Sequence, residues 1–170
     1  MTPPPRSQAD EHRRPPRSAE EQQRLDAALR ELFERQIRFN EVLGMKVESL
    51  DPTAPRIRFP MRDDLVGHFL YGRLHGGAIS SVLDATGGFA IMLAIADKHR
   101  DESAEQVMHR FARMGTIDLR VDFLRQGIGR AFVAGATVTR LGGRIASTQM
   151  TLSDDEGVLI ATAAAAYVIS

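Results

Sequence analysis

Apolar residues near the N-terminus recur every three or four positions, which is the spacing of one face of an α-helix. Ser18 and Glu21 precede them in the S-x-x-E pattern of a capping box, which satisfies free backbone N–H groups at a helix start. The apolar residues of this face are Leu25, Leu29, Leu32, Phe33 and Ile37. The pattern predicts a continuous helix over residues 19–40 within an N-terminal extension, residues 18–43. We expect the extension to pack on the rest of the chain or on a partner subunit.

Six further segments have the composition of β-strands, most clearly where apolar and polar residues alternate. In one of them the apolar side consists of Ile117, Leu119, Val121 and Phe123. The predicted strands are residues 45–50, 56–62, 116–124, 131–141, 144–152 and 158–169. The glycine pair 142–143 and residues 153–157 are predicted turns. The polar segment 97–115, with a short amphipathic helix, is predicted to be either a lid or a solvated insertion.

Residues 78–96 are almost all apolar or small, with one acid, Asp84, among them. A helix that is apolar all round has to be buried. A carboxylate in the middle of a membrane span costs about 2.5–3.5 kcal/mol, so a core helix is favoured over a membrane span. A sheet that curls around this helix would bury it on nearly all sides. The sequence therefore predicts an α+β domain over residues 44–170, in which an antiparallel sheet wraps one long central helix.

The composition excludes several classes of function. The 22 basic residues equal the 22 acidic residues, so no overall positive field attracts nucleic acid or anionic membranes. Cysteine is absent, which excludes a cysteine nucleophile, a thiolate metal site and disulfides, and is compatible with the cytoplasm. The histidines lack metal-ligand spacing, so we expect no metal and no cofactor. Residues 1–17 are rich in proline and arginine, without the apolar run of a secretory signal, and are predicted to be a disordered tail.

Small residues surround Asp84 on its face of the predicted helix, while bulky residues occupy the opposite face. These small neighbours are Gly77, Ser80, Ser81, Gly87 and Gly88. They leave room for a second backbone or for a ligand. Because a buried carboxylate is costly unless it is paired, Asp84 is either a functional group or a structural acid satisfied by neighbouring hydroxyls. The glycines correspondingly border a ligand or pack against a partner helix.

The sequence His75-Gly76-Gly77 opens the central helix, nine residues before the acid. The first N–H groups of a helix have no partner within the helix and lie at the positive end of its dipole. Glycine allows a carbonyl oxygen to approach these groups closely. This is the arrangement of an oxyanion site, although a glycine-rich tight turn has the same composition.

Residues 72–77 (GRLHGG) followed by Asp84 resemble the signature of hot-dog-fold thioesterases of the phenylacetate-degradation (PaaI-like) type, and in particular bacterial medium- and long-chain acyl-CoA thioesterases. Residues 116–125 (TIDLRVDFLR) are similar to the central strand of that family. The resemblance covers residues 44–169. It implies the hot-dog fold, an acyl-CoA substrate, and a homodimer or a tetramer built as a dimer of dimers.

The resemblance also implies roles for individual residues. Asp84 matches the nucleophile or the general base that activates water, and Gly76 matches the donor of the oxyanion N–H. Thr116 matches a hydroxyl residue that helps to place the water. The family's site lies between subunits, so Asp84 and Gly76 would come from different chains. Sequence alone does not choose between attack by Asp84 and attack by water.

His68 is a departure from the family, many of whose members have an asparagine shortly before the HGG motif. His68 is expected to hold the thioester, to assist the leaving thiolate, or only to fill the loop. Further residues are expected to contact the acyl part of the substrate or to fix the loop beside it: His75, Gly77, Ser80, Ser81 and Gly88. Basic residues expected at the phosphates of coenzyme A are Arg125, Arg140 and Arg144.

Two other functions fit the same pattern. A hot-dog dehydratase or hydratase would pair His68 with Asp84, and a non-catalytic sensor would bind acyl-CoA without hydrolysing it. The HGG motif with its acid favours the thioesterase. The many alanines suggest a roomy tunnel and therefore medium to long acyl chains. The residues do not distinguish coenzyme A from acyl carrier protein as the carrier.

Overall fold

The computed structural model describes residues 15–170, so most of the predicted disordered tail lies outside the described residues. The helices are α1 (Ala19–Glu31), α2 (Arg38–Leu43), α3 (Gly76–Lys98) and α4 (Ala104–Arg110), with single turns at Leu32–Gln36, Asp63–Leu65 and Phe111–Arg113. The strands are β1 (Lys46–Ser49), β2 (Arg56–Pro60), β3 (Val66–His68), β4 (Arg73–Leu74), β5 (Gly115–Phe123), β6 (Ala131–Leu141), β7 (Ile145–Asp154) and β8 (Leu159–Val168).

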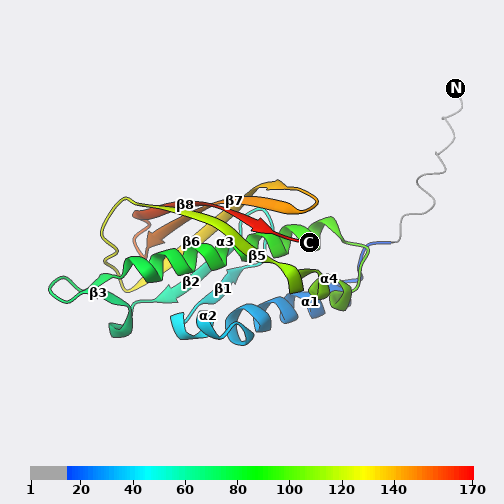
Figure 1. Cartoon of the computed structure of the whole chain (residues 1–170). Coiled ribbons are helices and arrows are strands. Elements are labelled where there is room, and N and C mark those ends of the chain that lie inside the picture. Colours follow the sequence, from blue (N-terminus) through cyan, green and yellow to red (C-terminus); the bar gives the residue numbers. More distant parts are fainter. Residues whose placement is uncertain (1–14) are drawn as a thin grey trace, which may run out of the picture.

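Six strands form one antiparallel sheet in the order β1-β2-β6-β7-β8-β5. Figure 1 shows α3 running between this sheet and the N-terminal helices α1 and α2. The predicted α+β architecture, a sheet around one long helix with an N-terminal helical extension, is therefore confirmed. The small hairpin β3–β4 projects beyond the N-terminal end of α3 (Figure 1).

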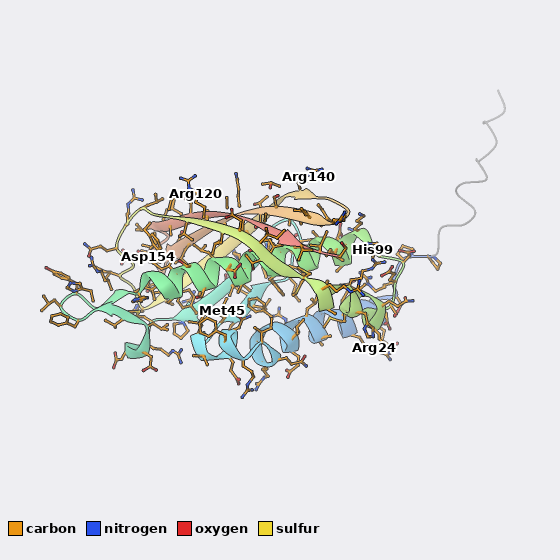
Figure 2. All side chains as sticks on the ribbon, in the orientation of Figure 1. Arg24, Met45, His99, Arg120, Arg140 and Asp154 are labelled. Atoms are coloured by element: carbon orange, nitrogen blue, oxygen red, sulfur yellow. The ribbon has the colours of Figure 1, made fainter. Side chains whose placement is uncertain are left out.

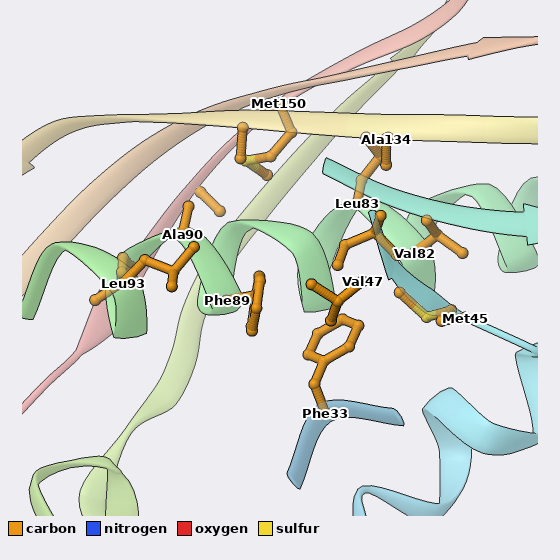
Figure 3. Packing of buried hydrophobic residues seen from close by; sticks show 14 of the residues in the cluster. Phe33, Met45, Val47, Val82, Leu83, Phe89, Ala90, Leu93, Ala134 and Met150 are labelled. Atoms are coloured by element: carbon orange, nitrogen blue, oxygen red, sulfur yellow. The ribbon is translucent and has the colours of Figure 1, made fainter. Parts of the chain in front are cut away.

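The core forms around α3, whose apolar residues point in all directions. Bulky side chains such as Val82, Leu83 and Phe89 are completely buried. Figure 3 shows that Met150 on β7 and Ala134 on β6 cover one side of the helix. α3 is also long and apolar enough to cross a membrane, but 61% of the relevant window is buried inside the protein. Its hydrophobicity is thus used within the fold, as expected for a core helix.

The N-terminal extension covers the side of α3 that the sheet leaves open. Leu25, Leu29 and Phe33 are almost fully buried, and the ring of Phe33 lies 4.6 Å from that of Phe89, centroid to centroid (Figure 3). The extension therefore packs on its own chain. Of the predicted capping box at the start of α1, only one half forms. This half is the bond that Ser18 Oγ accepts from the Glu21 N–H over 3.2 Å.

The carboxylate of Glu21 instead accepts from the Ala104 N–H at the start of α4, over 2.8 Å. It thereby ties α1 to the 97–115 segment. Val107 in α4 is fully buried, so part of this segment belongs to the core and is neither a free lid nor a solvated insertion.

The prediction of one continuous helix over residues 19–40 is wrong at Ile37. The Ile37 N–H donates to the Leu32 carbonyl five residues earlier, over 2.9 Å, which makes a π-helical turn. Ile37 itself is extended, and α2 begins after it. The side-chain N–H of Asn40 donates to the Phe33 carbonyl over 3.0 Å. This bond satisfies the carbonyl that an α-helix would have bonded to residue 37.

Arg17 shows where the prediction of a disordered tail is wrong. Its guanidinium donates to the carbonyls of Ala96, His99 and Glu102 over 2.6–2.9 Å. These groups lie at or just beyond the C-terminal end of α3, where carbonyls lack partners within the helix and a positive charge is favoured. The chain is thus anchored from Arg17 onward.

The expected alternation along β5 holds only in its middle. Leu119 and Val121 pack against the core, but Ile117 and Phe123 are 57% and 56% exposed. A bulge between Thr116 and Asp118 interrupts the register with β8. β5 is also an end strand of the sheet, so fewer neighbours cover its termini. The exposed Ile117 and Phe123 correct the sequence prediction of one buried side.

Gly87 allows α3 to approach the sheet closely. A Cβ atom at this position would clash with the Tyr167 hydroxyl and lie 2.9 Å from Thr148 Oγ1 and 3.0 Å from Met150 Sδ. A Cβ atom at Gly88 would meet nothing nearer than a Tyr167 ring carbon at 3.7 Å. The two adjacent glycines therefore have different roles. Gly87 is required for packing against the protein's own sheet, not for a ligand or a partner helix.

We predict opposite effects of alanine at these two positions on the free energy of unfolding, measured by urea denaturation. Gly87→Ala should lower it by about 2 kcal/mol, because Tyr167 is buried and has little space to move. Gly88→Ala should leave it unchanged or raise it by up to about 1 kcal/mol, because alanine favours the helix. Equal effects of the two substitutions would contradict this assignment.

Candidate active site

Asp84 lies half-buried on the outer side of α3, where the start of β5 crosses the helix. The Thr116 hydroxyl donates to Asp84 Oδ1 over 2.8 Å. The acid borders a pocket of about 310 Å³ lined mainly by apolar side chains, among them Phe33, Met92 and Met114. Asp84 therefore faces a cavity and is not sealed inside the protein.

Tyr167 on β8 fixes the helix backbone at the same place. Its hydroxyl donates to the main-chain carbonyl of Asp84 over 2.8 Å, and Thr116 is its neighbour in the sheet register. Burial, and next the negative charge of Asp84, raise the pKa of the Tyr167 hydroxyl well above its ordinary value. The hydroxyl thus remains protonated and can serve as a donor. Our sequence analysis missed Tyr167, although the alternation of β8 places it on the inner face.

The serines near Asp84 bond to the helix and not to the acid. Ser80 Oγ donates to the Gly76 carbonyl over 3.0 Å, and Ser81 Oγ donates to the Gly77 carbonyl over 2.8 Å. Among the described residues, Thr116 alone donates a side-chain hydrogen bond to the Asp84 carboxylate. The two helix serines therefore do not satisfy the acid, and the neighbouring hydroxyl that bonds it is that of Thr116. Ser81 and Gly88 line the Asp84 pocket.

The N-terminus of α3 presents a free backbone donor at Gly76. His75 Nδ1 accepts from the Gly77 N–H over 2.8 Å, so this side chain caps the helix and occupies that amide. The Gly76 N–H has no partner in the part of the chain that the structure describes. Gly76 borders a separate pocket of about 500 Å³ together with Phe123 and Arg125. His75 therefore shapes the loop, and Gly76 remains available to bind an oxygen.

Asp84 and Gly76 are not brought together in one protomer. They are eight residues apart on α3, which corresponds to about 12 Å along the helix axis. They also line different pockets. Reacting atoms have to approach within about 3–3.5 Å of the groups that act on them. A single carbonyl group therefore cannot contact both residues of the same chain.

His68 lies on the projecting hairpin and does not line the Asp84 pocket. Its ring stacks on Phe69 at 5.5 Å and lies 4.9 Å from the ring of Tyr71, centroid to centroid. Its Nδ1 atom is buried and has no hydrogen-bond partner among residues 15–170. Phe69 at the hairpin tip is 87% exposed. This hairpin thus carries His68 away from the Asp84 of its own chain.

The three arginines expected at coenzyme A occupy two distant places. Arg125 lies beside Gly76 and donates to the Leu159 carbonyl over 3.0 Å. Arg140 and Arg144 flank the β6–β7 turn, and Figure 2 shows Arg140 projecting outward from that end of the sheet. The glycines of this turn border a pocket with Lys98 at the far end of α3. The structure therefore separates Arg140 and Arg144 from both Asp84 and Gly76 of the same chain.

Comparison with known proteins identifies the family. Residues 71–161 match the model of the thioesterase superfamily. The medium/long-chain acyl-CoA thioesterase YigI of Escherichia coli K12 is 35% identical over 139 residues, which are 82% of this chain and 90% of that protein. YigI of Salmonella typhimurium is 34% identical over the same share of each chain.

Among solved structures, a protein from Shewanella oneidensis related to the thioesterase superfamily superposes with a TM-score of 0.83. It is 28% identical, and the match covers 91% of this chain and 100% of that one. The family match covers more than half of this chain, and the match to E. coli YigI covers most of both chains. The acid, the hydroxyl and the open helix N-terminus thus occur in a protein that belongs to the thioesterase superfamily.

Proposed function

We propose that the protein hydrolyses medium- to long-chain acyl-CoA thioesters to the free acid and coenzyme A. The main observation behind this proposal is that the Asp84 carboxylate accepts a hydrogen bond from Thr116 and borders a mainly apolar pocket. The names of the E. coli and Salmonella relatives support the same substrate class. The reaction needs a polar reactive centre beside an apolar binding site for the acyl chain, and this pocket combines the two.

The catalytic site requires two subunits in this proposal. Asp84 and Thr116 of one subunit face Gly76 of the other, since the two groups are too far apart within one chain. β5 supports such an arrangement, because it is an end strand with free backbone groups that a second copy can pair with. Its first half carries Thr116, and its last residue, Phe123, lies against Gly76.

Antiparallel pairing of two β5 strands about a twofold axis would therefore place each acid near the partner's free amide. The result is a dimer with two equivalent sites, and two such dimers can associate into a tetramer.

The mechanism follows from these groups. The thioester oxygen accepts a hydrogen bond from the Gly76 N–H, which stabilises the negative charge that develops in the tetrahedral state. Asp84 either attacks the carbonyl carbon or takes a proton from a water molecule that Thr116 helps to orient. When the tetrahedral state collapses, the carbon–sulfur bond breaks and coenzyme A leaves as a thiolate. Attack by water yields the acid directly, whereas attack by Asp84 yields an anhydride that water then hydrolyses.

The remaining predicted residues have different support. Arg125 lies beside Gly76 and is suitably placed to bind a phosphate of coenzyme A. His68 belongs to the hairpin at the same end of the protomer, but its Nδ1 is buried and it lines neither the Asp84 pocket nor the Gly76 pocket. Arg140 and Arg144 have no comparable support. A dehydratase would pair His68 with Asp84, but the HGG motif with its acid and the thioesterase relatives favour thioester hydrolysis over that reaction.

Asp84→Asn should lower kcat for an acyl-CoA by at least about a thousandfold, because the amide neither attacks nor accepts the proton. Thr116→Val should lower kcat about tenfold, and Thr116→Ser should restore it, because serine keeps the hydroxyl. Release of free thiol measures the rate. The control Asp101→Asn changes an exposed acid away from the pocket and should have no effect. Full activity of Asp84→Asn would refute the proposal.

Gly76→Pro should lower kcat by about 10²–10³-fold, because proline lacks the oxyanion N–H. Proline is tolerated at the first position of a helix, and His75 has the extended conformation (ψ 137°) that a residue before proline prefers. Gly76→Ala is the matched control, because it keeps the N–H and its Cβ would lie 3.4 Å from the Phe123 ring. Equal activities of the proline and alanine variants would exclude this amide as the donor.

A further inference from the structure

One wall of the Asp84 pocket is a stripe of α3. Residues at positions 81, 84, 85, 88 and 92 line it, and this spacing of three or four residues is one face of a helix. From Asp84 to Met92 the stripe extends about 12 Å along the helix axis. The pocket therefore leads from the reactive acid along the helix towards Met92, as a channel for an extended chain would.

The opposite wall comes from the N-terminal extension. Phe33, Ile37, Phe39 and Asn40 all border the same pocket. They lie outside residues 71–161, the part that matches the family model. The thioesterase domain thus supplies the acid, and a segment outside the family match supplies the facing wall.

The break in the extension determines how this wall is shaped. The π-helical turn ends at Ile37, and Asn40, which is only 3% exposed, bonds the freed carbonyl of Phe33. The chain therefore changes direction at the pocket. Phe33 is fixed in the core, whereas Ile37 is only half-buried and borders the cavity. A π-helical turn beside a pocket is a frequent feature of functional sites.

The side chains that line the Asp84 pocket indicate which kind of ligand it can hold. Most of the lining is apolar, and two methionines, Met92 and Met114, provide adaptable thioether surfaces that suit a flexible hydrocarbon. A pocket of about 310 Å³ with a single carboxylate is a poor site for a nucleotide, which carries several negative charges.

We propose that the N-terminal extension forms the acyl-binding wall of the site and that Ile37 sets the length of the acyl chain. This assignment rests on the proposed thioesterase function. It predicts that the size of residue 37 changes the preference among acyl-CoA substrates. Each methylene that the wall buries should raise kcat/KM about fourfold.

Hydrolysis of saturated acyl-CoAs from four to sixteen carbons tests the proposal, with the ratio of kcat/KM for the longest and shortest substrates as the readout. This ratio does not depend on the fraction of folded enzyme. Ile37→Phe should lower it at least tenfold, and Ile37→Ala should shift the optimum to longer chains. Ile145→Phe is the matched control: it places the same substitution at a half-exposed position away from the pocket and should leave the ratio unchanged.

Binding separates failure of this proposal from failure of the proposed function. In the Asp84→Asn background, Ile37→Phe should raise the Kd of the longest acyl-CoA at least tenfold relative to the shortest, by isothermal titration calorimetry. If the wild-type protein hydrolyses no acyl-CoA but Ile37→Phe shifts the Kd ratio, the proposed hydrolysis is wrong and the proposed acyl-binding wall is supported. If hydrolysis occurs and Ile37→Phe changes neither the kcat/KM ratio nor the Kd ratio, the proposed acyl-binding wall is wrong and the proposed hydrolysis is supported.

Discussion

The need to cover the apolar surface of α3 is the constraint on which the rest of the structure depends. This helix has apolar residues around most of its circumference, where contact with water would be unfavourable, and the face with Ser81, Asp84 and Gly88 is only half-buried. The sheet covers one side, and the N-terminal helices cover the other (Figure 1). The sheet and the N-terminal helices meet along the face of α3 that has the smallest residues, and the Asp84 pocket lies at this junction. The same packing that stabilises the helix thus creates the cavity.

The position of Asp84 at this junction explains how a core helix can carry an acid. A carboxylate sealed in the core would be strongly destabilised, whereas Asp84 is half-buried, borders a cavity and accepts a bond from Thr116. Tyr167 donates to the main-chain carbonyl of Asp84 and so holds the helix backbone at this point. These contacts orient the carboxylate and leave it able to react.

The sequence predicted the features that depend on local pattern. The uniform hydrophobicity of α3 and the strand alternation were enough for the fold, and the spacing of Asp84 from Gly76 was enough to single out both residues. Thr116 came only from family resemblance, and its bond to Asp84 agrees with the expected position.

Features that depend on three-dimensional neighbours were not predictable. Gly87 was grouped with the ligand-side glycines, because a helical wheel does not show how closely Tyr167 approaches. The break at Ile37 depends on a bond from Asn40 that no periodicity reveals. Arg140 and Arg144 were assigned to coenzyme A from their place beside a glycine turn, and sequence does not indicate at which end of α3 that turn lies.

The central claim is that two subunits share each site, and mixing two inactive variants tests it most directly. The Asp84→Asn and Gly76→Pro variants should each be inactive alone. For the test, equal amounts of the two variants are unfolded together and refolded as a mixture. Half of the dimers are then mixed, and each holds one intact site, so about a quarter of the wild-type thioesterase activity should return. If the mixture forms mixed dimers and remains as inactive as its components, Asp84 and Gly76 do not act across the interface.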